Sequence, residues 1–283
     1  MTGAHVGIVG SGIMATGVAE VAAMAGHHVT VRARKIASAE AVVAGVAKSL
    51  ERQVSKGRLD TEARDATLAR LTPTDSLADL AACDLVIENV VEDLAVKKDL
   101  MCELGGVCQP ATILATNTST LPVVELAVAS GRPDKVVGIH FFNPAPVMKL
   151  VEIVAPLTAS EETVAWATEF AQGCGKDTVA VADRAGFVVN ALLFPYLNNA
   201  VRLWEQGTAS IDDIDRAMMG GCGFPMGPFA LLDLVGLDTS VSILDALYAE
   251  FGDPNYKAVP TLRRKVAAGH LGRKSGQGFL SYR

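Results

Sequence analysis

The stretch His5-Val-Gly-Ile-Val-Gly-Ser-Gly-Ile-Met-Ala-Thr-Gly17 decides the fold of the first part of this chain. Its opening apolar residues predict a short buried strand, and apolar residues at helical spacing then continue to Ala25. Between the two, Gly10 makes a tight turn, and Gly12 lets backbone amides approach a pyrophosphate at the helix N-terminus. A second strand is predicted over residues 29–31. This order of strand, glycine turn, helix and strand predicts a dinucleotide-binding site.

Strand-like and helix-like stretches continue to alternate after this motif. Further strands are predicted over residues 84–89, 112–116, 135–140, 149–154 and 177–182. Helices are predicted over residues 37–55, 61–71 and 161–172, with other helical stretches between the strands. Such alternation implies a mostly parallel sheet with helices on both faces. Ligands of these sheets bind at the carboxyl ends of the strands, so we expect the functional residues there.

The sequence pattern changes near residue 183, after which nearly all of the chain is helix-like. Helices are predicted over residues 187–205, 211–219, 229–234, 238–251 and 259–268, before a closing strand-like stretch over 278–282. We therefore predict an α/β fold in which a Rossmann-type, mostly parallel sheet domain precedes an all-α domain. The dinucleotide-binding domain is expected over residues 1–183, and a helical substrate and dimerisation domain over residues 184–283.

The composition excludes several classes of protein. The chain has 283 residues, of which 50% are hydrophobic and 20% charged, and its net charge is −6. The negative charge argues against nucleic acid and anionic membranes as partners. No stretch resembles a signal peptide or a membrane span. The five cysteines are scattered without a C-x-x-C pair, which predicts reduced thiols and a cytoplasmic protein, and no metal is expected.

A histidine and a glutamate form the candidate catalytic pair. His140 and Glu152 belong to consecutive strand-like stretches joined by a proline-rich turn, so their side chains are within reach of each other. A carboxylate beside an imidazole fixes its tautomer and stabilises its charged form, which is the arrangement of a general base. The alternative is a buried structural histidine beside a surface glutamate, and the residue types alone do not separate the two.

Motifs that follow one another along nearly the whole chain carry a resemblance to a known family. They are Gly10-x-Gly12-x-Met14, Val90-Val-Glu-Asp-x-x-x-Lys97, Asn117-Thr-Ser119, Ile139-His-Phe-Phe-Asn-Pro144, Lys149-Leu-Val-Glu152, Arg184-Ala-Gly-Phe-Val-Val-Asn190, Pro225-Met-Gly-Pro228, Val235-Gly-Leu-Asp-Thr239 and Gly272-Arg-Lys-Ser-Gly-x-Gly-Phe279. With these motifs the sequence resembles the 3-hydroxyacyl-CoA dehydrogenase family, in its short-chain 3-hydroxybutyryl-CoA dehydrogenase form.

The resemblance implies reversible oxidation of a 3-hydroxyacyl thioester, with hydride transfer between C3 and a nicotinamide cofactor, NAD(P). His140 resembles the family's catalytic base and Glu152 its carboxylate partner, while Ser119 and Asn190 resemble the groups that hydrogen-bond the reacting substrate. The positions that match the family's cofactor contacts are Gly10, Gly12, Ile13, Met14, Glu92, Lys97, Asn143 and Lys274. The resemblance also implies an acyl-CoA substrate and a homodimer.

The resemblance also assigns a role to one face of the helix predicted over residues 37–55 and to the residue that follows it. Ser49 and Lys56 match the family's coenzyme A contacts, and a cation there suits a phosphorylated carrier. From spacing alone, this stretch would be a solvated helix face.

The chain departs from the family at the end of the second predicted strand. The family usually has an aspartate there that binds the adenosine ribose hydroxyls, whereas this chain has Ala33, followed by Arg34. The loss of the carboxylate removes repulsion against a 2′-phosphate, and Arg34 offers two parallel hydrogen bonds to one. The sequence therefore favours NADP(H) over NAD(H). The alternatives are that Ala33 only weakens NAD binding or that Arg32 and Arg34 point to solvent.

Three other functions compete with this interpretation. A relative that acts on hydroxyacyl groups tethered to an acyl-carrier protein would share the core motifs, because both carriers present phosphopantetheine. A two-domain 3-hydroxyacid dehydrogenase with a lysine base in its helical domain is disfavoured, since no lysine lies near Asn190 in the sequence. A cofactor-binding protein without catalytic activity is disfavoured by the complete set of Ser119, His140, Glu152 and Asn190.

Overall fold

The computed structural model describes residues 3–282, and the chain divides into two compact units, Met1–Asp183 and Arg184–Arg283. Within the described residues, the strands of the first unit form one eight-stranded sheet. The strands are β1 (His5–Val9), β2 (His28–Arg32), β3 (Leu71–Thr74), β4 (Leu85–Glu88), β5 (Ile113–Thr116), β6 (Val136–Phe141), β7 (Leu150–Ala155) and β8 (Asp177–Ala182). Their order across the sheet is β3-β2-β1-β4-β5-β6-β7-β8.

The strand directions agree with the sequence prediction. β6 and β7 pair antiparallel, whereas the other neighbouring strands of the sheet pair parallel. All four residues of β4 and of β5 are buried, as expected for central parallel strands covered by helices on both faces. The predicted mostly parallel, Rossmann-type sheet is therefore confirmed.

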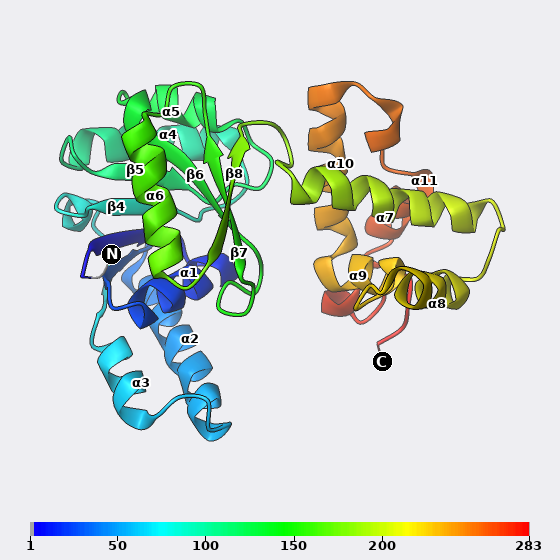
Figure 1. The fold of residues 1–283 in the computed structure, drawn as a ribbon, viewed down its shortest axis with the longest axis horizontal. Coiled ribbons are helices and arrows are strands. Elements are labelled where there is room, and N and C mark those ends of the chain that lie inside the picture. The colour runs from blue at the N-terminus through cyan, green and yellow to red at the C-terminus, as the bar shows by residue number, and fades with distance from the viewer. Residues whose placement is uncertain (1–2, 283) are drawn as a thin grey trace. The chain divides into compact units, whose positions relative to one another are not determined.

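Helices cover both faces of this sheet (Figure 1). They are α1 (Ile13–Met24), α2 (Ile36–Ser55), α3 (Thr61–Leu68), α4 (Leu94–Val107), α5 (Val123–Ala129) and α6 (Glu161–Gly173), with short 3-10 turns η1 (Ala78–Leu80) and η2 (Pro133–Lys135). In Figure 1, α6 lies on the near face of the sheet, and α4 and α5 lie on the far face. Buried residues of α1, α2 and α6 share one apolar cluster with the strands, so these three helices cover the same face.

One strand differs from the sequence prediction. The predicted helix over 61–71 ends as α3 at Leu68, and Leu71 begins β3, which the sequence analysis did not include. β3 has four residues, and one of them is Pro73. A proline cannot donate a hydrogen bond to a neighbouring strand, so it is tolerated on an edge strand, and β3 is an edge of this sheet.

The second unit is helical. Its elements are α7 (Val189–Glu205), α8 (Ile211–Cys222), α9 (Pro228–Val235), α10 (Leu237–Phe251) and α11 (Pro260–Ala267), with 3-10 turns η3 (Pro254–Tyr256) and η4 (Arg273–Ser275). Trp204, Phe229 and Phe279 meet edge to face in its core, with ring centroids 4.9–6.3 Å apart. No helix among the described residues of the chain combines the length and apolar character needed to cross a membrane.

The closing stretch of the second unit is a tight loop, so the strand-like pattern predicted over 278–282 is wrong. Only an isolated bridge between Gln277 and Ser281 forms there. The buried carboxylate of Asp233 accepts hydrogen bonds from the amides of Phe279 and Leu280, both at 2.8 Å. Residues 278–282 alternate in polarity like a strand but fold around the Asp233 carboxylate of α9. The alternation of polarity does not reveal this partner.

A buried histidine between α1 and β2 predicts acid sensitivity. His27 is fully buried, its Nδ1 accepts a hydrogen bond from the Ala4 amide at 3.2 Å, and burial lowers the pKa of its imidazole. Below about pH 6.5 the unfolded chain binds a proton here that the folded chain excludes, so the free energy of unfolding falls as the pH falls. His27→Phe should reduce this loss, measured by urea unfolding at about pH 7.5 and about pH 5.5. An equal loss in both proteins would contradict the prediction.

Candidate active site

A cavity of about 690 Å³ opens at the carboxyl ends of the strands in the first unit. Residues that follow β1, β2, β4 and β5 line it, together with one side of α4. The sequence-predicted residues in its lining are Gly10, Gly12, Ile13, Met14, Ala33, Arg34, Glu92, Lys97 and Ser119. Asp99 and Glu103 of α4 also line the cavity, although the sequence analysis did not single them out.

The glycine turn at one wall of the cavity suits a pyrophosphate. Gly10 has a φ of +142°, and a Cβ there would lie 2.4 Å from the carbonyl oxygen of Asn89, so a side chain does not fit. Gly12 is the N-cap of α1, no side chain caps that end, and a Cβ there would meet no atom within 4 Å. The first amides of α1 are thus open at the cavity, as anion binding at a helix N-terminus requires.

Three side chains form a hydrogen-bonded relay that ends at the cavity. His140 of β6 lies directly opposite Glu152 of β7, and its Nδ1 is 2.8 Å from the Glu152 carboxylate. Its Nε2 is 3.0 Å from the Ser119 hydroxyl, which follows β5 and lines the cavity. Because a carboxylate only accepts hydrogen bonds, the neutral imidazole carries its hydrogen on Nδ1 and presents the lone pair of Nε2 to Ser119.

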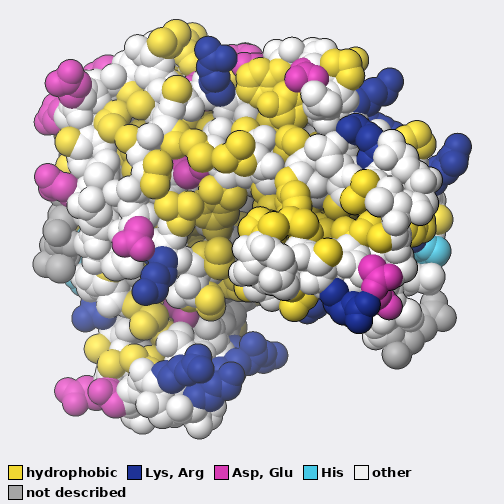
Figure 2. All heavy atoms as spheres, turned by 45° about the vertical axis from the view of Figure 1, so that its right-hand side comes forward, with side chains coloured by type: hydrophobic (Ala, Val, Ile, Leu, Met, Phe, Trp, Pro, Cys, Tyr) yellow, Lys and Arg dark blue, Asp and Glu magenta, His cyan; other side chains and the backbone are white. Residues whose placement is uncertain are grey.

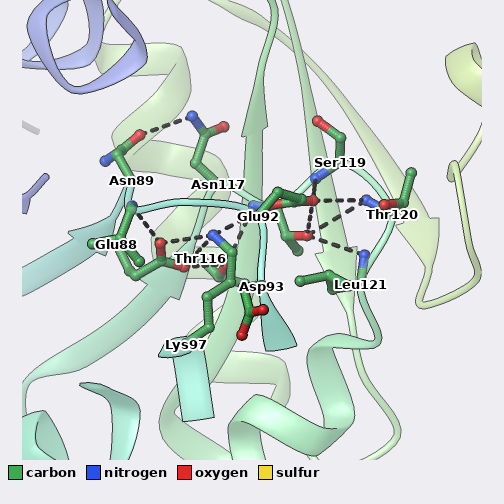
Figure 3. A network of polar contacts seen from close by, with 12 residues as sticks. Glu88, Asn89, Glu92, Asp93, Lys97, Thr116, Asn117, Ser119, Thr120 and Leu121 are labelled. Carbon is green, nitrogen blue, oxygen red and sulfur yellow. Dashed lines mark hydrogen bonds and ion pairs between the residues drawn. The ribbon is translucent and has the colours of Figure 1, made fainter. Parts of the chain in front are cut away.

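Lys97 is buried, and its ammonium points toward Glu88 (Figure 3). Its side chain is 1% exposed, and its ammonium donates to both carboxylate oxygens of Glu88, at 2.7 and 2.8 Å. Glu92 lies 3.3 Å from the same ammonium, and its other oxygen accepts from the Ser119 amide at 2.9 Å. Lys97 borders the cavity, but its charge is already paired.

Two other cofactor candidates do not line the cavity. Asn143 is exposed on the loop after β6, and the peptide bond that joins it to Pro144 is cis. Lys274 belongs to η4 of the second unit, where its ammonium pairs with Asp238 at 2.7 Å. Asn190 also belongs to the second unit and lies in the first turn of α7.

The two candidate coenzyme A contacts lie on the second helix. Ser49 belongs to α2, and Lys56 is the C-cap of that helix. In Figure 2, Lys and Arg side chains gather at the protruding end of the α2–α3 pair. Glu20 of α1, a buried carboxylate whose pKa is raised by burial, accepts a hydrogen bond from Gln53 of α2 at 2.8 Å.

An asparagine pair joins three strand ends, and the sequence analysis did not assign it. Asn117 donates to Asn89 at 2.8 Å, and its oxygen accepts from the Phe141 amide at 2.7 Å. Asn89 in turn donates to the carbonyl oxygen of Ile87 at 3.0 Å. These bonds connect the ends of β4, β5 and β6 beside the relay. The available signal was their position, Asn89 at the end of one strand-like stretch and Asn117 directly after the next.

Fold and cavity together define a dinucleotide-binding protein of the Rossmann class. Residues 5–184 match the family model of the 3-hydroxyacyl-CoA dehydrogenase NAD binding domain, and residues 186–282 match that of the 3-hydroxyacyl-CoA dehydrogenase C-terminal domain. The chain belongs to the 3-hydroxyacyl-CoA dehydrogenase family.

Relatives from bacteria and mammals match over nearly the full length. The chain is 48% identical over 284 residues to 3-hydroxybutyryl-CoA dehydrogenase of Mycobacterium tuberculosis, covering 98% of both proteins. It is 40% identical over 290 residues to human mitochondrial hydroxyacyl-coenzyme A dehydrogenase, covering 99% of this chain and 91% of that protein. A crystal structure of (S)-3-hydroxybutyryl-CoA dehydrogenase from Ralstonia eutropha superposes with a TM-score of 0.96 at 39% identity, covering 100% of both chains.

Proposed function

We propose that this protein is an oxidoreductase that interconverts 3-hydroxyacyl-CoA and 3-oxoacyl-CoA with a nicotinamide cofactor. The observation that carries the proposal is the hydrogen-bonded relay of Ser119, His140 and Glu152. Ser119, at one end of the relay, lines the cavity. The glycine turn and the open N-terminus of α1 fit the pyrophosphate of the cofactor. Relatives named as 3-hydroxybutyryl-CoA dehydrogenases, one of them 48% identical, give the same activity.

The relay accounts for the movement of the proton. In oxidation, Nε2 of His140 takes the proton of the substrate 3-hydroxyl, and Glu152 stabilises the imidazolium through Nδ1. In reduction, the protonated His140 returns that proton to the oxygen. The Ser119 hydroxyl lies within hydrogen-bond distance of His140 Nε2, so it is placed to hold the substrate oxygen beside that nitrogen. A bound nicotinamide dinucleotide supplies the hydride acceptor or donor.

The Glu152→Gln variant tests whether the Glu152 carboxylate contributes to proton transfer by His140. We expect turnover to fall roughly tenfold or more, because a neutral amide does not stabilise the imidazolium. The pH–rate profile for oxidation should also move to lower pH, since the imidazolium then gives up its proton more readily. Rates measured across the pH range for both proteins test this, and an unshifted profile would show that the two residues are not coupled.

The end of β2 supports NADP(H) as the preferred cofactor. Ala33 is buried there and leaves no carboxylate to repel a 2′-phosphate. Arg34 lines the cavity and is exposed, and among the described residues no side chain pairs with its guanidinium. Arg32 of β2 also lines the cavity, but its Nε donates to the carbonyl oxygen of Asp75 at 3.4 Å. Arg34 is therefore the guanidinium we assign to the phosphate.

The proposal extends to the remaining family positions. Asn190 hydrogen-bonds the reacting substrate, Ser49 and Lys56 contact coenzyme A, and Asn143 and Lys274 contact the cofactor. Residues 1–183 form the dinucleotide-binding domain, and residues 184–283 form the substrate and dimerisation domain of a homodimer. All five cysteines are free thiols, which supports a cytoplasmic location.

Initial rates with acetoacetyl-CoA test the proposed reaction. We expect oxidation of the reduced cofactor, followed by its absorbance, with a higher rate for NADPH than for NADH at equal low concentration. Acetoacetyl attached to an acyl-carrier protein, at the same concentration, should react more slowly. Absence of turnover with either thioester, in a protein that binds the cofactor, would overturn the proposed reaction.

A further inference from the structure

Glu88, at the carboxyl end of β4, is a buried carboxylate without a role in the relay. Its side chain is 0% exposed. It accepts hydrogen bonds from the Val90 amide at 2.6 Å, from the Thr116 hydroxyl at 2.9 Å, and twice from the Lys97 ammonium. A buried carboxylate is costly unless it is paired and hydrogen-bonded, and this one has donors on both oxygens. Figure 3 shows Thr116 and Lys97 directed at it.

The Lys97 ammonium joins Glu88 to a second carboxylate, Glu92. Glu92 accepts from the Thr118 hydroxyl at 2.5 Å, from the Ser119 amide at 2.9 Å and from the Thr120 amide at 3.4 Å. Figure 3 shows it directed at the turn that carries Ser119. Thr116 forms a second route to that turn, because its hydroxyl donates to Glu88 and accepts from the Thr118 amide at 3.2 Å.

We propose that Glu88 is a positioning residue that acts through Lys97, Glu92 and Thr116 to hold the Ser119 hydroxyl against Nε2 of His140. Continuous contacts of 2.5–3.4 Å run from Glu88 to the turn, and Ser119 then meets His140 at 3.0 Å. This inference rests on the proposed function, because it assigns the network a task in that reaction.

The charges explain why Glu88 matters to a turn that it does not touch. One ammonium lies between two carboxylates, 2.7 Å from Glu88 and 3.3 Å from Glu92. Without the charge on Glu88, the ammonium has Glu92 as its remaining partner and draws it closer. Glu92 then moves away from the Ser119 and Thr120 amides, and the Ser119 hydroxyl moves with its backbone. A shift of about 1 Å in a positioned group lowers a rate by up to about a hundredfold.

A double-mutant cycle tests whether Glu88 acts through Ser119. We expect Glu88→Gln to lower kcat about tenfold, with less change in the KM for the cofactor. In a Ser119→Ala background, the same substitution should have little further effect, because the hydroxyl that it misplaces is gone. A full reduction in both backgrounds would overturn the proposal. The proposal would also be overturned if Ser119→Ala left kcat unaffected while Glu88→Gln lowered it.

If Glu88→Gln does not fold, a pair of less disruptive substitutions tests the same proposal. Thr116→Val removes one hydrogen bond to Glu88 and should lower kcat a few-fold, with no further effect in the Ser119→Ala background. Its matched control is Thr112→Val, directly before the start of β5, which removes the buried hydrogen bond from the Thr112 hydroxyl to the Cys83 carbonyl oxygen at 2.6 Å. Thr112→Val should leave kcat unchanged, and equal losses of kcat in the two variants would overturn the proposal.

A spectroscopic measurement separates this inference from the reaction itself. The ¹⁵N signal of His140 Nε2 reports the hydrogen bond from Ser119, whether or not a substrate turns over. We expect Thr116→Val and Glu88→Gln to move that signal toward its position in Ser119→Ala, and Thr112→Val to leave it in place. Moved signals in a protein that turns over no thioester would contradict the proposed reaction alone. Unmoved signals in an active enzyme would overturn the role of Glu88.

Discussion

Turnover of the His140→Gln variant is expected to fall by about 10²–10⁴, the usual contribution of general acid–base catalysis. The glutamine amide does not accept the proton of the substrate hydroxyl, whereas the imidazole Nε2 is placed to do so. Its binding of the cofactor should be nearly unchanged, because His140 does not line the cavity that we assign to the cofactor. Steady-state rates and a fluorescence titration of the cofactor measure the two effects separately.

The exposed His28, at the start of β2, offers a matched control. His28→Gln makes the same chemical change away from the relay and should keep the rate of the parent protein. A folded His140→Gln variant with undiminished turnover would refute the assignment of the base. An equal loss in the two variants would point to a general effect on stability rather than on proton transfer.

The second large effect concerns the choice of cofactor. If Arg34 holds a 2′-phosphate, NADPH should bind more tightly than NADH, because a charge-assisted hydrogen bond contributes about 1.5–3 kcal/mol, or about ten- to a hundredfold in affinity. Ala33→Asp should reverse the preference by repelling the phosphate and accepting bonds from the ribose hydroxyls. Arg34→Ala should weaken NADPH alone. Fluorescence titration of both cofactors against the three proteins gives the comparison.

The controls for the cofactor prediction are internal to the titration. Each variant is compared for NADH as well as NADPH, so a general loss of binding is recognised as such. Arg58→Ala, at an exposed arginine beyond the end of α2, should change neither affinity. A parent protein that prefers NADH, or an Arg34→Ala variant that weakens both cofactors equally, would leave Ala33 as a weakened NAD site.

Sequence patterns predicted the elements that depend on local periodicity. The first strand, the glycine turn and α1 follow from apolar spacing and two glycines, and the structure has them where predicted. β3 was missed because four residues with a proline lack the alternation of a strand. It forms because β2 offers a free edge, and this edge is a property of the whole sheet.

The sequence predicted the contact between His140 and Glu152 at the candidate site but not the contacts of Lys97. The strand ends indicated His140 and Ser119, since parallel strands bring their carboxyl ends to one edge, and the proline-rich turn between two consecutive strand-like stretches indicated Glu152. Lys97 was predicted as a cofactor contact, yet its ammonium is bound by Glu88. Which oxygen a long, flexible side chain meets depends on the packing of β4 against α4. The sequence spacing does not carry that information.

The antiparallel register of β6 and β7 makes enzymatic activity a reporter of strand pairing. His140 and Glu152 share a face only because they are direct cross-strand neighbours. A slip of one residue would turn one of them to the opposite face, while leaving the content of strand and helix unchanged. During refolding, circular dichroism would therefore count a slipped protein as folded. The recovery of turnover would count only those molecules in which these two strands have found their native alignment.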